Sequence, residues 1–103
     1  MDKPVYVQVV NFGAMPVNTY KQIYHNIKNI DKVFEVSGVA NTATNQPILI
    51  PNTSFNTGYW YAEVALSADR NLIQIVTKAD SGYTDLIQDV TAIVKLRYTK
   101  TTN

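Results

Sequence analysis

Hydrophobic and polar residues alternate along most of the chain with the two-residue period of a β-strand. The clearest run covers residues 90–99, where Val94 and Leu96 share one face and Lys95 and Arg97 share the other. No segment sustains the 3.6-residue period of an amphipathic helix. The pattern therefore predicts an all-β chain.

Clusters of Gly, Pro and Asn separate the alternating runs and mark turns. Residues 47–51 are bracketed by Pro47 and Pro51, which predicts a short strand at a sheet edge. Short strands separated by turn signals roughly every ten residues are typical of an antiparallel β-sandwich, here expected to be jelly-roll-like. The expected strands, about seven in number, cover residues 5–12, 19–25, 32–39, 47–51, 59–67, 72–78 and 90–99.

The alternation also predicts which side chains form the core. In the third expected strand, Phe34 and Val36 are predicted to point inward. The other predicted core residues are Trp60, Val64, Leu66, Ile73, Ile75, Val94 and Leu96.

The length and the net charge of the chain limit the classes of protein to which it can belong. With 103 residues, we expect one domain spanning 1–103, large enough for a core without disulfides, and the chain has no cysteine. The net charge of +1 comes from nine basic and eight acidic residues that are scattered along the chain, so we expect no nucleic-acid binding. No apolar stretch approaches the roughly 20 residues of a membrane-spanning helix, so we expect no membrane insertion.

Candidate catalytic and metal-binding residues are few. His25 is the only histidine, and beside Asn26 it is predicted to stabilise a turn rather than act as a base or ligand. Asp80, Asp85 and Asp89 could share a cation, but their spacing matches no calcium-binding loop. No serine lies in a glycine-flanked nucleophile elbow. We therefore expect a protein that is not an enzyme and needs no metal or cofactor.

Tyr59, Trp60 and Tyr61 form the one suggestive cluster, with both tyrosines on one strand face and the tryptophan on the other. The tyrosines could stack on a sugar ring, because a phenol offers an apolar face with a polar tip. They could instead pack against another chain, since aromatic residues are enriched at protein interfaces, and we favour this interpretation. Together with Tyr83, these two tyrosines form the candidate binding set.

Six short motifs, taken together, suggest a family. They are Lys-Pro-Val-Tyr at 3–6, Asn-Phe-Gly-Ala-Met-Pro at 11–16, His-Asn-Ile followed by Asn-Ile-Asp within 25–31, Ser-Ala-Asp-Arg-Asn at 67–71, Ser-Gly-Tyr-Thr at 81–84 and the final segment 96–103. In this order the chain resembles a C-terminal module of tail-fibre, baseplate and other minor structural proteins of phages and prophages. In that family a glycine often precedes the Lys-Pro pair, whereas Met1-Asp2 stands here. We therefore expect either an excised domain or a shortened stand-alone relative.

The resemblance implies a homotrimeric virion appendage, made in the bacterial cytoplasm, that contacts other virion proteins and a host-surface glycan. It carries no catalytic or sugar-binding residue onto this chain. The alternative is a monomeric carbohydrate-binding module of a secreted or prophage-borne hydrolase. Self-association would use a tyrosine-rich face, because the chain has more aromatic residues than an aliphatic core needs. The tyrosines on strand faces that are opposite, or ambiguous to, the predicted core residues are Tyr6, Tyr20, Tyr24, Tyr59 and Tyr61.

Overall fold

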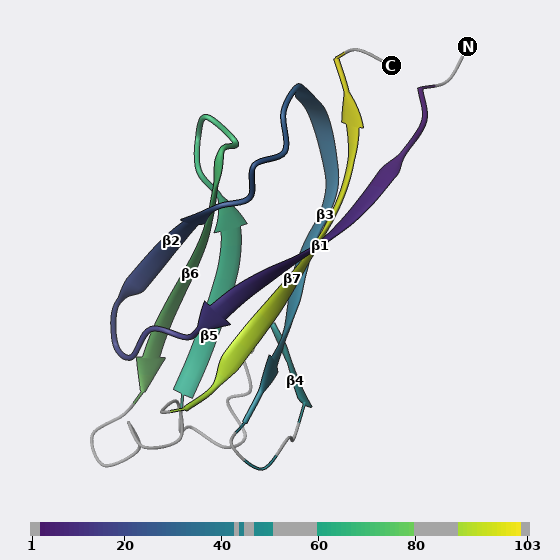
Figure 1. Ribbon diagram of the computed structural model, residues 1–103. Coiled ribbons are helices and arrows are strands. Elements are labelled where there is room, and N and C mark those ends of the chain that lie inside the picture. The colour runs from purple at the N-terminus through teal and green to yellow at the C-terminus, as the bar shows by residue number, and fades with distance from the viewer. Residues whose placement is uncertain (1–2, 43, 45–46, 51–59, 80–88, 102–103) are drawn as a thin grey trace.

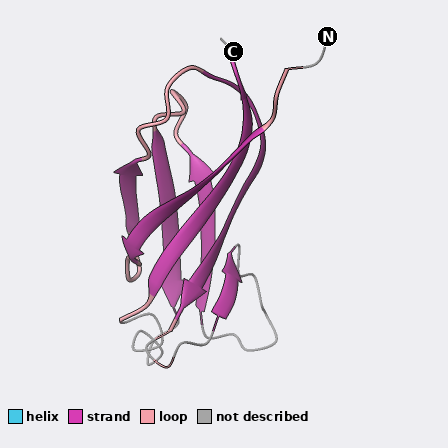
Figure 2. Cartoon of the chain, turned by 45° about the vertical axis from the view of Figure 1, so that its right-hand side comes forward, coloured by secondary structure: helices cyan, strands magenta, loops and turns pink. Residues whose placement is uncertain are grey.

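Seven antiparallel strands form two packed sheets, as the computed structural model shows (Figures 1 and 2). The structure describes residues 3–42, 44, 47–50, 60–79 and 89–101. The larger sheet has the order β1-β7-β3-β4, and the smaller sheet has the order β2-β6-β5. The prediction of an antiparallel β-sandwich with about seven strands is confirmed. The strands are β1 (Tyr6–Ala14), β2 (Tyr20–Tyr24), β3 (Ile30–Asn41), β4 (Pro47–Ile50), β5 (Trp60–Leu66), β6 (Leu72–Ala79) and β7 (Thr91–Lys100).

Strands that are far apart in the sequence pair with each other in both sheets. The first strand pairs with the last, and β2 pairs with β6. Tyr6 lies opposite Tyr98, so the start of β1 and the end of β7 meet at one end of the sandwich (Figure 1). The molecule is elongated, with principal extents of 52 × 22 × 20 Å. In the described part of the chain, no helix is long and apolar enough to cross a membrane.

The core lies between the sheets and follows the predicted alternation. Every second residue of β7 from Ala92 to Tyr98 is buried, and so are Ile73 and Ile75 of β6. Among the predicted core residues, Ile73, Ile75, Val94 and Leu96 are buried, while Val64 and Leu66 are partly buried and pack against them. The side chain of Trp60 lies outside the described part.

The prediction that Phe34 points inward is wrong, because this side chain is 59% exposed. The pairing of β3 with β7 shifts register between Ile30 and Val33 and again between Val33 and Glu35. Phe34 is therefore an extra residue in a β-bulge, and a bulge re-aims side chains that strict alternation would place inside. Val36, beyond the bulge, packs against the core as predicted.

A second bulge bends β1 near its end. The register with β7 shifts between Asn11 and Gly13, and Phe12 turns into the core with 3% exposure. Gly13 has a φ of 87°, which glycine adopts without the steric cost of a Cβ atom. The Asn11 side chain accepts a hydrogen bond from the Gly13 amide at 3.1 Å. The regular part of β1 therefore ends at Asn11.

Buried hydrogen bonds fasten the connection between β1 and β2 to β6. The hydroxyl of Thr77 donates to the Pro16 carbonyl at 2.7 Å and accepts from the Asn18 amide at 3.1 Å. The side-chain oxygen of Asn18 accepts from the Ala79 amide at 2.6 Å. Thr77 is only 2% exposed, so its bond to the Pro16 carbonyl satisfies two buried polar groups, while the two bonds of Asn18 are part-buried.

Candidate binding surface

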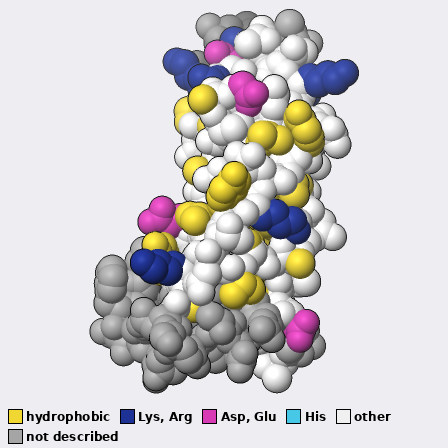
Figure 3. Space-filling view, turned by 90° about the vertical axis from the view of Figure 1, so that its left-hand side faces the viewer, with side chains coloured by type: hydrophobic (Ala, Val, Ile, Leu, Met, Phe, Trp, Pro, Cys, Tyr) yellow, Lys and Arg dark blue, Asp and Glu magenta, His cyan; other side chains and the backbone are white. Residues whose placement is uncertain are grey.

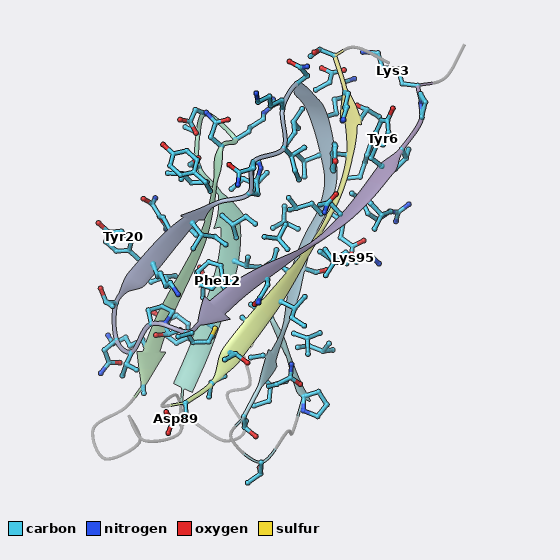
Figure 4. The ribbon with its side chains drawn as sticks, viewed as in Figure 1. Lys3, Tyr6, Phe12, Tyr20, Asp89 and Lys95 are labelled. Carbon is cyan, nitrogen blue, oxygen red and sulfur yellow. The ribbon has the colours of Figure 1, made fainter. Side chains whose placement is uncertain are left out.

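Three tyrosines stand exposed on the outer face of the smaller sheet, and we call this set the tyrosine face: Tyr20 and Tyr24 of β2 and Tyr61 of β5. Their side chains are 61%, 69% and 39% exposed. Tyr20 and Tyr24 share a face because an even number of residues separates them, while Ile23 between them packs against the core. Figure 4 shows Tyr20 at β2, pointing away from the sandwich.

Amide and charged side chains lie among the rings. Gln22 is opposite Gln74, and Nε2 of Gln22 donates to Oε1 of Gln74 at 2.8 Å. The neighbouring strand positions on this face include Glu63 and Lys78, one charge of each sign. Seen from the side of β2, the exposed hydrophobic side chains form separate patches along the length of the molecule (Figure 3). Such a surface can pack against a protein or stack on a sugar ring.

The predicted binding set is only partly placed by the structure. Tyr61 is exposed on the outer face, whereas Tyr59 and Tyr83 lie outside the described residues. Tyr20 and Tyr24, two of the tyrosines on faces opposite or ambiguous to the predicted core, are exposed. The sequence signal for them is the run 20–24, in which Tyr20, Gln22 and Tyr24 alternate with Lys21 and Ile23.

Tyr6 does not belong to this surface: of the two faces that the sequence leaves open for it, Tyr6 lies on the one that packs against the core. Its ring stacks on that of Tyr98, with the ring centroids 5.8 Å apart and an interplanar angle of 23°. Lys100 Nζ lies 4.8 Å from the centroid of the Tyr6 ring. Tyr6 shares the inner face of β1 with Val10, so it packs against the core instead of facing solvent.

The outer face of the larger sheet carries a shallow groove with aliphatic walls and a volume of about 700 Å³. Its aliphatic lining residues are Val9, Val39, Leu49, Ile50 and Ile93, and we call this feature the aliphatic groove. Leu49 is 74% exposed. The groove is distinct from the tyrosine face, because the two lie on the outer faces of different sheets.

Charged residues border the aliphatic groove on one side. Oε1 of Glu35 lies 3.9 Å from Lys95 Nζ and 3.7 Å from the Arg97 guanidinium. The Ser37 hydroxyl donates to Glu35 Oε2 at 2.7 Å. This hydrogen bond, followed by the two neighbouring cations, lowers the pKa of the Glu35 carboxyl below its ordinary value. The carboxylate is solvated, so the contacts orient the rim and add little stability.

His25 has the turn-stabilising role that was predicted. Its Nδ1 accepts a hydrogen bond from the Ile27 amide at 2.9 Å, and its Nε2 contacts the Arg70 carbonyl oxygen. Because Nδ1 is the acceptor, Nε2 carries the proton in this arrangement. His25 is 8% exposed and thus joins the turn after β2 to the β5–β6 hairpin.

The described residues contain no group of three or more His, Cys, Asp or Glu side chains that could hold a metal ion. Of the three loop acids, Asp89 is exposed and has a φ of 58°, whereas Asp80 and Asp85 lie outside the described part. Among the described residues, the tyrosine face is the leading candidate for a binding surface.

Comparisons of the chain with family models, with curated proteins and with solved structures gave no match.

Proposed function

We propose that this protein is a non-catalytic attachment module of a phage tail fibre or another virion appendage, and that it assembles as a homotrimer and contacts a host-surface glycan. The observation that supports the proposal is the tyrosine face. Three large amphipathic rings are held in solvent on one rigid sheet, where their burial by a partner would release apolar surface from water. The virion setting and the threefold symmetry come from the motif resemblance.

The composition of the face favours a protein partner. Tyrosines in contact with another chain can bury their rings while their hydroxyl groups keep hydrogen bonds, and this suits the core of an interface. Gln22 and Gln74 already satisfy part of each other's hydrogen-bonding capacity, which lowers the cost of covering them. With one lysine and one glutamate nearby, the face carries no strong field of either sign.

The proposal is tested by sedimentation velocity from one to one hundred micromolar. We expect the wild type to form a trimer or an assembly built from trimers, and the double variant Tyr20→Ala/Tyr24→Ala to lose these species. Leu49→Ala is the matched control, since Leu49 is equally exposed but lies on the other sheet. A wild-type protein that stays monomeric at tens of micromolar, where a micromolar interface is occupied, would refute the trimer.

A carbohydrate-binding module is the second candidate, and the same three tyrosines support it. Their rings offer flat apolar faces, and the amides of Gln22 and Gln74 can exchange their mutual hydrogen bond for sugar hydroxyls. In that case the protein is monomeric, and a glycan array gives binding that the Tyr20→Ala/Tyr24→Ala variant loses. A monomer without glycan binding contradicts both candidates.

A further inference from the structure

Each sheet of the sandwich has two edge strands, and an exposed edge presents unpaired backbone N–H and C=O groups to other chains. Three of the four edges carry features that discourage such pairing. β4 is four residues long and begins at Pro47, while Pro51 follows it in the sequence. β2 has five residues and contains Lys21, and β5 contains Glu63. Short length, proline and charge are the usual protections of a sheet edge.

The fourth edge, β1, lacks these protections. It is nine residues long and has neither a charged residue nor a proline. In the described structure it pairs only with β7, so its other side is free. Val7 and Val9 on its outer face are 56% and 58% exposed. A long, uncharged, valine-rich edge is the kind that pairs with another strand.

The far end of β1 is closed to pairing, which limits the free stretch. The bulge at Asn11 and Gly13 bends the strand. Lys21 covers the segment beyond it, because its Nζ donates to the Ala14 carbonyl at 2.8 Å and lies 5.0 Å from the centroid of the Phe12 ring. The free, regular edge therefore runs from Tyr6 to Val10.

We propose that this edge pairs antiparallel with β1 of a second copy of the chain, so that the two larger sheets become one continuous sheet. A second copy fits because the segment 6–10 contains no charge that would meet its own like in a symmetric pair. A two-fold arrangement uses the same patch on both subunits, which closes the assembly and leaves no free β1 edge.

The geometry of a continuous sheet also restricts the register. Residues opposite each other across two strands point to the same face, so outer positions of β1 must face outer positions of the second copy. In an antiparallel symmetric pair, this condition places one residue directly opposite its own copy. We assign that place to Gln8, because Val7 then faces Val9 and Tyr6 faces Val10, and every pair stays within the free stretch.

Gln8 suits the two-fold position chemically. Its side chain is exposed, and two glutamine amides facing each other can exchange a donor and an acceptor. The molecule already contains this arrangement, since Gln22 and Gln74 are cross-strand partners joined at 2.8 Å. The contact goes beyond the proposed trimer and does not depend on it, because the tyrosine face lies on the other sheet. A protein with both contacts would form assemblies in which trimers are joined to one another through β1.

Cysteine cross-linking tests the register directly, since the chain contains no cysteine of its own. Directly opposed strand residues have Cα atoms about 4.5–5.5 Å apart, within the range that a disulfide bridges. We expect Gln8→Cys to form a covalent dimer under mild oxidation at tens of micromolar. Leu49→Cys, on the exposed face of β4 at the opposite edge of the same sheet, is the matched control and should remain largely uncross-linked. Equal cross-linking of the two variants overturns the proposal.

A charge test separates the edge from the aliphatic groove and from the tyrosine face. The double variant Val7→Lys/Val9→Lys should reduce the two-fold species at least tenfold in sedimentation velocity, because like charges then face each other. Leu49→Lys, which places a lysine in the groove at the opposite edge of the same sheet, should leave that species unchanged. Monomers and trimers without any even-numbered species would overturn the edge pairing while leaving the trimer intact. Dimers without trimers would overturn the proposed trimer and leave the edge pairing intact.

Discussion

Thr77 shows how one hydroxyl group can position a whole connection. It donates a hydrogen bond to the Pro16 carbonyl and accepts one from the Asn18 amide. Both groups belong to the segment that connects the larger sheet to β2. Because β2 holds Tyr20 and Tyr24, this buried contact also helps to place the tyrosine face.

We predict that Thr77→Val lowers the free energy of unfolding by about 1–3 kcal/mol, because the nearly isosteric change removes the partner of the buried Pro16 carbonyl and of the part-buried Asn18 amide. Urea unfolding monitored by circular dichroism measures the effect. Thr91→Val, at an exposed position of β7, is the control and should change stability by less than about 0.5 kcal/mol. Equal effects of the two substitutions would contradict the assigned role.

At the scale of the elements, the ladder between β1 and β7 carries a titratable core residue. Burial raises the pKa of the Tyr98 phenol above its ordinary value of 10.0, and the neighbouring Tyr6 acts in the same direction. Below pH 10 the phenol is neutral in both the folded and the unfolded chain, and its contribution to stability is complete. As the pH rises further, the unfolded chain loses this proton first, so stability falls until the pH passes the folded pKa.

We therefore predict that Tyr98→Phe loses less stability than the wild type between pH 8 and pH 11. Urea unfolding at both pH values gives the comparison, and the lysines contribute equally to the two proteins. The same loss in both proteins would show that Tyr98 does not titrate as its burial requires.

The strands differ in how far the sequence could predict them. β6 and β7 alternate without interruption, so Ile73, Ile75, Val94 and Leu96 were assigned to the core correctly. β3 contains two register shifts, and an inserted residue inverts the alternation without any mark in the hydrophobic pattern, which is why Phe34 was misplaced. Only tertiary pairing with β7 reveals these bulges.

β1 presents a different difficulty, because both of its faces are hydrophobic. Val7 and Val9 alternate with Tyr6 and Val10, so periodicity cannot tell the core face from the solvent face. The stack of Tyr6 on Tyr98 resolves the choice. For the binding surface, the sequence indicated exposed tyrosines, but it could not show that Tyr20, Tyr24 and Tyr61 share one sheet face, because strand order is a long-range property.

At the scale of the whole molecule, the close approach of the start of β1 and the end of β7 predicts tolerance to circular permutation. A short Gly/Ser linker from Thr101 to Lys3, with new ends between Ala68 and Asp69 in the β5–β6 turn, should preserve the β spectrum and cooperative melting. New ends between Val94 and Lys95, inside the central strand β7, should prevent folding. Circular dichroism and thermal melting of both permutants decide the matter.

The same adjacency determines how the sandwich responds to pulling. A load applied to both ends of the described chain would peel β1 from β7 like a zipper, so the hydrogen bonds of the ladder would break one after another under a small force. A load applied between one end of the chain and a partner bound to an outer face acts differently. It does not pull β1 and β7 apart at the end of the sandwich where they meet, so it does not break the ladder bond by bond. The domain should therefore withstand tension between one end and a partner bound to an outer face better than tension between its own two ends.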